Sequence, residues 1–478
     1  MVQDNLKQRT KKGLYWSALG NFANQGIRFV FGLILARLLS PDAYGIIGML
    51  TVFMCVIQVF IDCGFSQALI AKQDRTQIDF STEFFFNIIV GFAAYMVLFI
   101  SAPFIAAFYN MPELSTITRV IGVGVIINSL CVVQSAQFSI KLDFKTPAKI
   151  GFYTQFFSGI IGIILAYCDF GVWALVFQQI LGGILNAILL WLFAGWFPSL
   201  VFSHSSFKYL WNYGNKILGA SLIQQIYDNI YPLVIGKFFN ASSLGLYSRA
   251  QGFASLPSTN LSGIIGNVSF PVLAKLGNDK ESLVKVYRKM IKTTAFLVFP
   301  LMIGMAAVAS PTIKVLLNEQ WNGCIIMLQL LCFALIWNPL SSLQLNVIKV
   351  IGRTDIIFKL EIYKRSFGLL TIFASIPFGV VGMCIGFDIF YIYCFILNTI
   401  YINRVLKIGL KGQMYDVLII FINSAVMGLI VFGLTFLPVF ETVKLLLGII
   451  VGCIYYYISS KYFFKDTLDN VLTLIKTR

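Results

Sequence analysis

Charged side chains are scarce in this chain of 478 residues: Asp, Glu, Lys and Arg make up 12% of the sequence, whereas 58% is hydrophobic. Globular domains average about 25% charged residues and roughly 45–50% apolar ones. A bilayer core of about 30 Å is crossed by roughly 20 apolar residues in a helix, and irregular backbone cannot face the lipid. The composition therefore excludes a water-soluble globular protein and predicts an all-α integral membrane protein.

Histidine is nearly absent, and no two cysteines stand at CxxC spacing. The chain has one histidine and nine cysteines, and it contains no CxxC pair. Because the cysteines fall inside or beside apolar runs, we expect reduced packing residues, with no disulfide framework, no metal site and no cofactor. His204 stands in a Ser-rich connection, where a solvated loop residue is expected rather than a catalytic base.

Enzyme motifs are absent as well. The chain has no Walker A sequence and no acidic loop cluster of the kind that a metal-dependent glycosyltransferase needs. The formal charge of +16 does not indicate nucleic-acid binding, because the basic residues are dispersed over many short loops. We therefore expect a protein that is not an enzyme, and a membrane-embedded enzyme is the contrasting alternative.

Apolar runs between Gly, Pro and charged breaks fill almost the whole chain and predict about fourteen transmembrane helices. The expected spans are residues 14–38, 43–70, 84–109, 117–140, 148–168, 171–196, 212–236, 244–271, 293–317, 324–348, 357–377, 380–403, 416–437 and 443–463. The first apolar run is too long for a signal peptide and lacks a small-residue cleavage site, so we expect span one to be retained.

Basic residues alternate between the two sides of these spans. One side would hold 26 of them, including Lys7, Arg9, Lys11 and Lys12 before span one. The other side would hold five: Arg37, Arg119, Lys237, Lys314 and Lys444. Because cytoplasmic loops are rich in Lys and Arg, this asymmetry predicts a multi-pass bacterial inner-membrane protein with both termini in the cytoplasm.

An internal repeat divides the chain. At an offset of 200, Ala36–Ser40 aligns with Gly236–Asn240 and Gly45 with Gly245; at an offset of 208, Pro103 aligns with Pro311, Lys141 with Lys349, and Phe170–Val172 with Phe378–Val380. We expect six-helix lobes at 1–203 and 204–411, and two further helices with a tail at 412–478. An even-numbered repeat relates the lobes by an axis along the membrane normal, with a cavity between them, as in alternating-access transporters. A duplicated bundle without transport is the alternative.

Polar side chains follow one face of the first span and recur at the equivalent place in span seven. Asn21, Asn24, Gln25 and Arg28 form the first polar stripe, and Ser221, Gln224, Gln225 and Asp228 form the second polar stripe. Polar residues inside a bilayer are costly and normally face the bundle interior. We therefore expect both stripes to line the cavity, with Arg28 and Asp228 pointing into it from facing lobes.

Intramembrane cations suggest an anionic substrate. Guanidinium groups bind phosphate in a bidentate fork and stay charged when desolvated, which suits Arg28 and Arg249 to such a lining. Alternatively, Arg28 pairs with Asp228 or Asp62, and Arg249 extends to lipid headgroups. Lys364 and Arg365 could receive a phosphate from the cytoplasmic side, or form an ion cluster with Glu361 one turn earlier.

Carboxylates and aromatics supply the remaining candidates. Asp62, Asp228 and Asp388 are candidates for binding a coupling ion. Asp62 shares a helix face with Gln58. Tyr227 and Tyr231, beside the second polar stripe, are candidates for stacking on sugar rings.

The stretch Gly32–Gly45, GLILARLLSPDAYG, resembles the opening of bacterial Wzx-type polysaccharide exporters. These belong to the multidrug/oligosaccharidyl-lipid/polysaccharide (MOP) exporter superfamily, and the likeness extends to length, span count and repeat. The resemblance implies a V-shaped pair of lobes that flips undecaprenyl-pyrophosphate-linked oligosaccharide, such as an O-antigen, capsule or exopolysaccharide repeat unit, from the cytoplasmic to the periplasmic leaflet. Implied partners are Na⁺ or H⁺ as coupling ion and the polysaccharide polymerase and ligase machinery.

The superfamily leaves two alternatives open. Flippases of the peptidoglycan precursor also use cavity arginines, so arginine alone does not separate them from Wzx-type exporters. Drug-exporting relatives favour cavity carboxylates for cationic substrates, and Asp62 and Asp228 are compatible with that chemistry.

Overall fold

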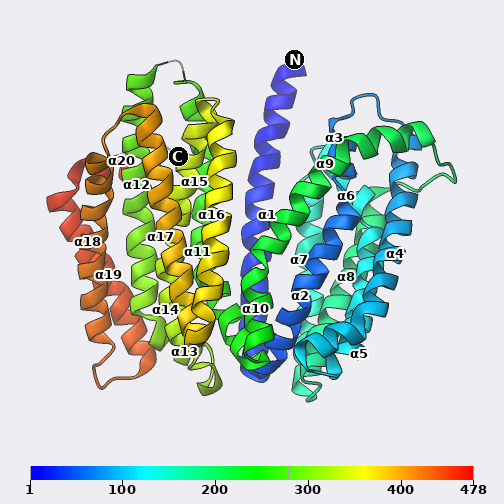
Figure 1. Cartoon of the computed structure of the whole chain (residues 1–478), viewed down its shortest axis with the longest axis horizontal. Helices are drawn as coiled ribbons and strands as arrows, with labels where there is room; N and C mark the ends of the chain where they lie inside the picture. The colour runs from blue at the N-terminus through cyan, green and yellow to red at the C-terminus, as the bar shows by residue number, and fades with distance from the viewer. Residues whose placement is uncertain (1, 278, 477–478) are drawn as a thin grey trace. The chain divides into compact units, whose positions relative to one another are not determined.

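The computed structural model describes residues 2–277 and 279–476, and every regular element in these ranges is a helix (Figure 1). The prediction of an all-helical membrane protein is confirmed. The side chains of Lys7, Arg9, Lys11 and Lys12 lie outside the described residues.

The chain forms two compact units, Met1–Gly245 and Leu246–Arg478. The first unit contains α1 (Val2–Leu38), α2 (Pro41–Asp62), α3 (Phe65–Ala71), α4 (Gln77–Tyr109), α5 (Glu113–Ser129), α6 (Val132–Ile140), α7 (Lys145–Tyr167), α8 (Val172–Ala194), α9 (His204–Asp228), α10 (Ile230–Phe238) and the first turn of α11 (Ala241–Ala274). The expected boundary at residue 203 describes the sequence repeat and stays a prediction.

The second unit contains the rest of α11 and α12 (Lys280–Ala307), α13 (Ala309–Leu316), η1 (Glu319–Trp321), α14 (Cys324–Leu335), α15 (Asn338–Val350), α16 (Thr354–Ser375), η2 (Ile376–Phe378), α17 (Gly379–Leu406), α18 (Leu410–Leu434), α19 (Glu441–Phe463) and α20 (Lys465–Lys476). Helices α18 and α19 pack against each other, and they reach the rest of the unit through α12 and α13 (Figure 1).

Within the described ranges, ten stretches are long and apolar enough to cross a membrane, judged by length and composition. One of them, Asp355–Leu406, covers both α16 and α17. Large apolar side chains such as Phe104, Leu192 and Leu429 are exposed on these helices. That exposure suits a surface that contacts lipid rather than water.

Several expected spans are interrupted. Helix α2 ends at Asp62, and Cys63 (φ 41°) and Gly64 (φ 69°) adopt left-handed backbone before α3 begins. Left-handed φ is strained for most side chains and suits glycine. Gly214 of α9 packs against this break, since a Cβ there would stand 2.3 Å from the Cys63 carbonyl oxygen. The expected span 117–140 is likewise divided between α5 and α6.

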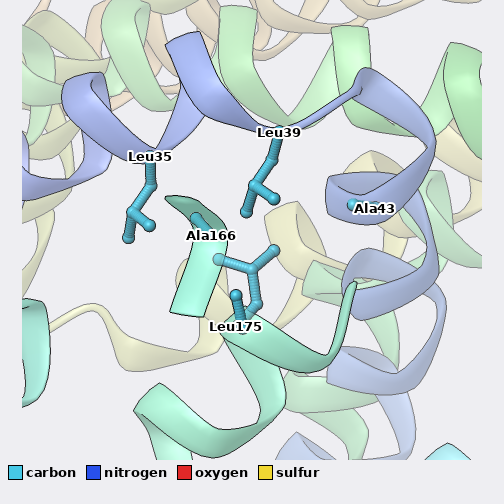
Figure 2. Close-up of a cluster of buried hydrophobic side chains, with 6 residues drawn as sticks. Leu35, Leu39, Ala43, Ala166 and Leu175 are labelled. Carbon is cyan, nitrogen blue, oxygen red and sulfur yellow. The ribbon is translucent and has the colours of Figure 1, made fainter. Parts of the chain in front are cut away.

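The turn between α1 and α2 is fixed by local signals and by packing. Ser40 caps α2 by accepting from the Ala43 amide at 3.4 Å, and Pro41 takes the first helical position, where its missing N–H is not needed. Leu35, Leu39 and Ala43 bury their side chains against Ala166 of α7 and Leu175 of α8 (Figure 2). This cluster ties the start of α2 to the α7–α8 pair.

A reciprocal contact joins the N-termini of α2 and α11. A Cβ on Gly45 would stand 1.7 Å from the Ala241 carbonyl oxygen, and a Cβ on Gly245 would stand 1.9 Å from the Pro41 carbonyl oxygen. Residues 41 and 241, and 45 and 245, are equivalent at the offset of 200. A contact in which each side presents the equivalent residue to the other indicates local two-fold symmetry.

Candidate functional site

The first polar stripe lies on a helix that packs on α7. Asn24 is half-buried and donates from Nδ2 to the Ala148 carbonyl at 3.5 Å, and Gly151 leaves room for it. Asn21 and Arg28 are exposed, and Gln25 is half-buried. Asn24 is thus engaged with α7, while Arg28 keeps its guanidinium accessible.

The second polar stripe runs along the C-terminal half of α9. Gln224 donates from Nε2 to both carboxylate oxygens of Asp228 at 2.8 Å, as residues one turn apart on a helix can. Ser221 and Gln225 are half-buried, and the Gln225 carbonyl accepts from Asn229 at 2.9 Å. The second polar stripe ends where α9 ends at Asp228, just before α10 begins.

Asp62 belongs to a small amide network in the first unit. Asn128 of α5 donates to Gln58 Oε1 at 3.4 Å, and Gln58 donates to Asp62 Oδ1 at 3.5 Å. Within the described part of the chain, no ion pair joins Arg28 to Asp62 or Asp228, and both carboxylates are instead held by glutamine. These carboxylates can accept a cation without first breaking an ion pair.

Tyr227 and Tyr231 are separated by the end of α9. Tyr227 is half-buried on α9, whereas Tyr231 is buried on α10. The two rings therefore do not form one continuous helical face.

Arg249 is held inside the second unit. Its guanidinium carbon lies 5.6 Å from the ring centroid of Trp321, a fully buried residue of η1. Stacking of this kind suits arginine, whose planar cation is weakly hydrated.

Lys364 and Arg365 lie on α16 with Glu361. Arg365 Nε is 3.5 Å from Glu361 Oε2, and Lys364 Nζ is 3.9 Å from Glu361 Oε1. Lys364 is buried and Arg365 is partly exposed. The expected one-turn cluster is present, and its net charge is positive.

Asp388 is half-buried on α17, and its Oδ1 atom is enclosed without a hydrogen-bond donor among the described residues. A carboxyl oxygen buried in this way carries a desolvation cost that a bound cation or proton would offset.

A buried polar cluster around Glu83 was missed by the sequence reasoning. Glu83 on α4 is fully buried and accepts from Ser66 Oγ of α3 at 3.0 Å, while its Oε2 atom has no donor among the described residues. Asn87 lies next to it, one turn further along α4. Gln134, on the neighbouring helix α6, is also fully buried, and neither of its amide atoms has a partner in the described ranges.

A capping signal could have revealed this cluster. Span three was expected to begin at residue 84, which left Glu83 in a loop. The sequence Thr76-Gln77-Ile78-Asp79 is a capping box, and α4 does begin at Gln77, with the Thr76 amide donating to Asp79 Oδ2 at 2.7 Å. A helix that begins there includes Glu83.

Comparisons with known proteins identify relatives of this chain. A family described as "Polysaccharide biosynthesis protein" matches residues 34–326. Teichuronic acid biosynthesis protein TuaB of Bacillus subtilis (strain 168) is 25% identical over 435 residues, which cover 90% of each chain. Lipopolysaccharide biosynthesis protein WzxC of Escherichia coli (strain K12) is 25% identical over 421 residues, covering 86% of this chain and 83% of the relative.

The fold also matches a solved structure. Lipid II flippase MurJ, in an inward closed conformation, superposes with a TM-score of 0.77 at 16% identity, covering 95% of this chain and 99% of the other. At that identity the likeness shows the fold alone. Because the family match spans more than half of the chain, the protein belongs to the polysaccharide biosynthesis protein family, and its similarity to WzxC agrees with the resemblance to Wzx-type exporters.

Proposed function

We propose that this protein flips an undecaprenyl-pyrophosphate-linked oligosaccharide from the cytoplasmic to the periplasmic leaflet of the inner membrane. The observation that carries the proposal is the family match over residues 34–326. The names of TuaB and WzxC place those relatives in teichuronic acid and lipopolysaccharide biosynthesis, so an anionic lipid-linked saccharide is the cargo class that we transfer to this chain.

The proposed topology has fourteen spans and two cytoplasmic termini. Counting α16 and α17 separately, and adding the long polar helices α1, α9–α10 and α11 to the ten apolar stretches, gives that number. The basic residues of the 275–292 segment then face the cytoplasm. Labelling of single cysteines supports this topology if 278–282 reacts only from inside and 240–242 only from outside; the reverse pattern contradicts it.

Alternating access is the proposed mechanism, with repeats at 1–203 and 204–411 as the moving halves and 412–478 as an appendage. The reciprocal contact of Gly45 and Gly245 supports a two-fold relation between the repeats. The polymerase and ligase machinery would receive the flipped product.

In this mechanism the cations guide the pyrophosphate and the carboxylates bind the coupling ion, Na⁺ or H⁺. Lys364 and Arg365 receive the pyrophosphate, and Arg28 holds it beside the amides of the first polar stripe. Multiple weak sites favour passage, because each site must also release its ligand. Asp62, Asp228 and Asp388 remain the candidates for the coupling ion.

Transport of a defined lipid-linked oligosaccharide in reconstituted vesicles tests the proposal. We expect Arg28→Ala to lower the flipping rate by about tenfold or more, because a charge-assisted bond to phosphate is lost. Arg28→Lys should restore only part of the rate, since lysine cannot form the bidentate fork. Arg37→Ala is the matched control: it lies nine residues further along α1, which places it on the opposite helix face.

The drug-antiporter alternative gives a different result. If Arg28→Ala keeps full flipping or complementation while Asp62→Asn and Asp228→Asn abolish export of a cationic drug, the flippase proposal is wrong.

A further inference from the structure

A cavity of about 640 Å³ opens in the second unit, outside the polar stripes. Its wall is formed by the beginning of α12, the beginning of α16 and the end of α17. Its size lies within the roughly 300–1,000 Å³ that small-molecule sites usually have. None of the site residues expected from the sequence lines it.

The lining of this cavity, which we call the basic cavity, is strongly cationic. Lys280, Arg353, Lys359 and Arg404 line it, against the single carboxylate of Asp355. Four cations and one anion leave a surplus of three positive charges. Asp279, next to Lys280, is not part of the lining; hydrogen bonds from Ser282 and from the Glu281 amide lower the pKa of Asp279, so it stays charged and offsets part of the nearby positive charge.

One lining pair already shows the geometry of oxyanion binding. Arg353 donates from Nε and Nη2 to the two carboxylate oxygens of Asp355, each at 2.8 Å. Both side chains are about half exposed, at 53% and 50%, and exposed ion pairs contribute little stability. A phosphate can therefore compete for this guanidinium at small cost.

The rest of the cavity suits an amphiphilic ligand. Ile351, Val405 and Leu406 are half-buried apolar residues of the lining, so they offer apolar surface to a ligand. The Arg404 guanidinium stacks 5.2 Å from the ring centroid of Tyr401, and Tyr363 adds a second phenol to the lining. Stacking fixes the plane of a guanidinium and leaves its N–H edge for a ligand.

We propose that the basic cavity binds the phosphate headgroup of an anionic lipid, with the cations on the phosphate and the apolar lining on the adjoining carbons. Basic pockets between helices on the cytoplasmic side are suited to such headgroups. Binding itself does not depend on the proposed function; the further step, that the headgroup is the pyrophosphate of the transported lipid awaiting entry, rests on it.

Titration of the purified full-length protein tests the proposal. The probes are farnesyl pyrophosphate, inorganic pyrophosphate, uncharged farnesol, and vesicles containing phosphatidylglycerol. We expect farnesyl pyrophosphate to bind at least about tenfold more tightly than inorganic pyrophosphate or farnesol, because it alone uses both parts of the cavity. Tight binding of the vesicles but not of farnesyl pyrophosphate would assign the site to bulk phospholipid. It would overturn the claim that the bound headgroup is the pyrophosphate of the transported lipid.

Two variants of opposite expected effect identify the site. The double variant Lys359→Ala/Arg404→Ala should lower the affinity for farnesyl pyrophosphate by roughly tenfold or more. Asp355→Asn should raise that affinity, because a repelling charge is lost and Arg353 is released. Lys411→Ala, an exposed cation on α18 outside the lining, is the matched control. A general loss of folding cannot produce the gain at Asp355→Asn.

The outcomes separate this proposal from the proposed function. Unchanged affinity in both variants, or equal affinity for inorganic pyrophosphate and farnesyl pyrophosphate, overturns the lipid site whatever the transport assay shows. If binding responds as expected but no lipid-linked saccharide is flipped, the headgroup site stands and the transport proposal is wrong.

Discussion

Helices α4 and α12 are aligned by the proposed repeat at the offset of 208, and their buried faces differ in chemistry. At the offset of 208, Glu83 corresponds to Ile291 and Asn87 to Ala295, and all four residues are at most 1% exposed. The second copy therefore has apolar side chains at both of these positions. Since burying a carboxyl is costly, the fold alone does not require Glu83.

The two copies of the repeat have the same residue type where their backbones touch. Gly45 and Gly245 each stand against the other copy's equivalent carbonyl, with no space for a side chain. Backbone contact restricts both copies to glycine, whereas a side-chain contact can be rebuilt with other residues, as α4 and α12 show.

The largest expected loss of stability tests the glycine contact that both copies share. Gly45→Val or Gly245→Val places carbon atoms less than 2 Å from a backbone carbonyl oxygen, so α2 and α11 must separate. We expect a loss of more than about 4 kcal/mol of stability, enough to remove most folded protein. Size-exclusion chromatography of a fluorescent fusion measures it, and Gly252→Val, in open space on α11, is the control. Normal yield and elution of Gly245→Val would show that the reciprocal contact is dispensable.

A smaller effect is expected where the copies differ. Ile291→Glu introduces a charge at a buried apolar position and should cost several kcal/mol. Glu83→Gln keeps an acceptor for Ser66 and adds donors for the surrounding amides, so its effect should stay within about 1 kcal/mol. Thermal unfolding in detergent compares the two. Equal losses from both variants would mean that Glu83 is as strongly required by packing as Ile291.

Helical periodicity made much of this architecture predictable. The one-turn spacing correctly placed Gln58 with Asp62 and Glu361 with Arg365, because those contacts depend only on local helix geometry. The resemblance carried by Gly32–Gly45 led to the right family.

Contacts between distant segments could not be predicted in the same way. The break at Cys63 and Gly64 is packed by Gly214, and Asn24 is engaged by Ala148, so neither is encoded in its own neighbourhood. The basic cavity gathers Lys280, Lys359 and Arg404 from three helices. In the sequence these three residues are only part of the 26 basic residues expected on one side of the spans, since their convergence appears only in the fold.

The smallest expected effect concerns the appended helices, which only the second copy carries. Arg288 and Lys292 of α12 correspond to Phe80 and Phe84 of α4 at the same offset. The two phenylalanines pack on Trp196, whereas the two cations hold Asp416 of α18 at 2.6 and 2.9 Å. The second copy has thus exchanged an aromatic contact for an ion pair with α18.

Asp416→Asn should therefore cost about 1–3 kcal/mol, because the carboxylate is nearly buried and two cations lose their partner. The cations are about 40% exposed, so water relieves part of that loss. Glu441→Gln, at the other end of the appendage, removes the partly exposed partner that Lys314 and Lys444 share and should cost less than about 1 kcal/mol. Thermal unfolding at low and high salt separates them, since screening should abolish the effect of Glu441→Gln and leave most of that of Asp416→Asn. An equal salt dependence of the two variants would show that Asp416 behaves as a surface charge, and that α18 is held by apolar packing alone.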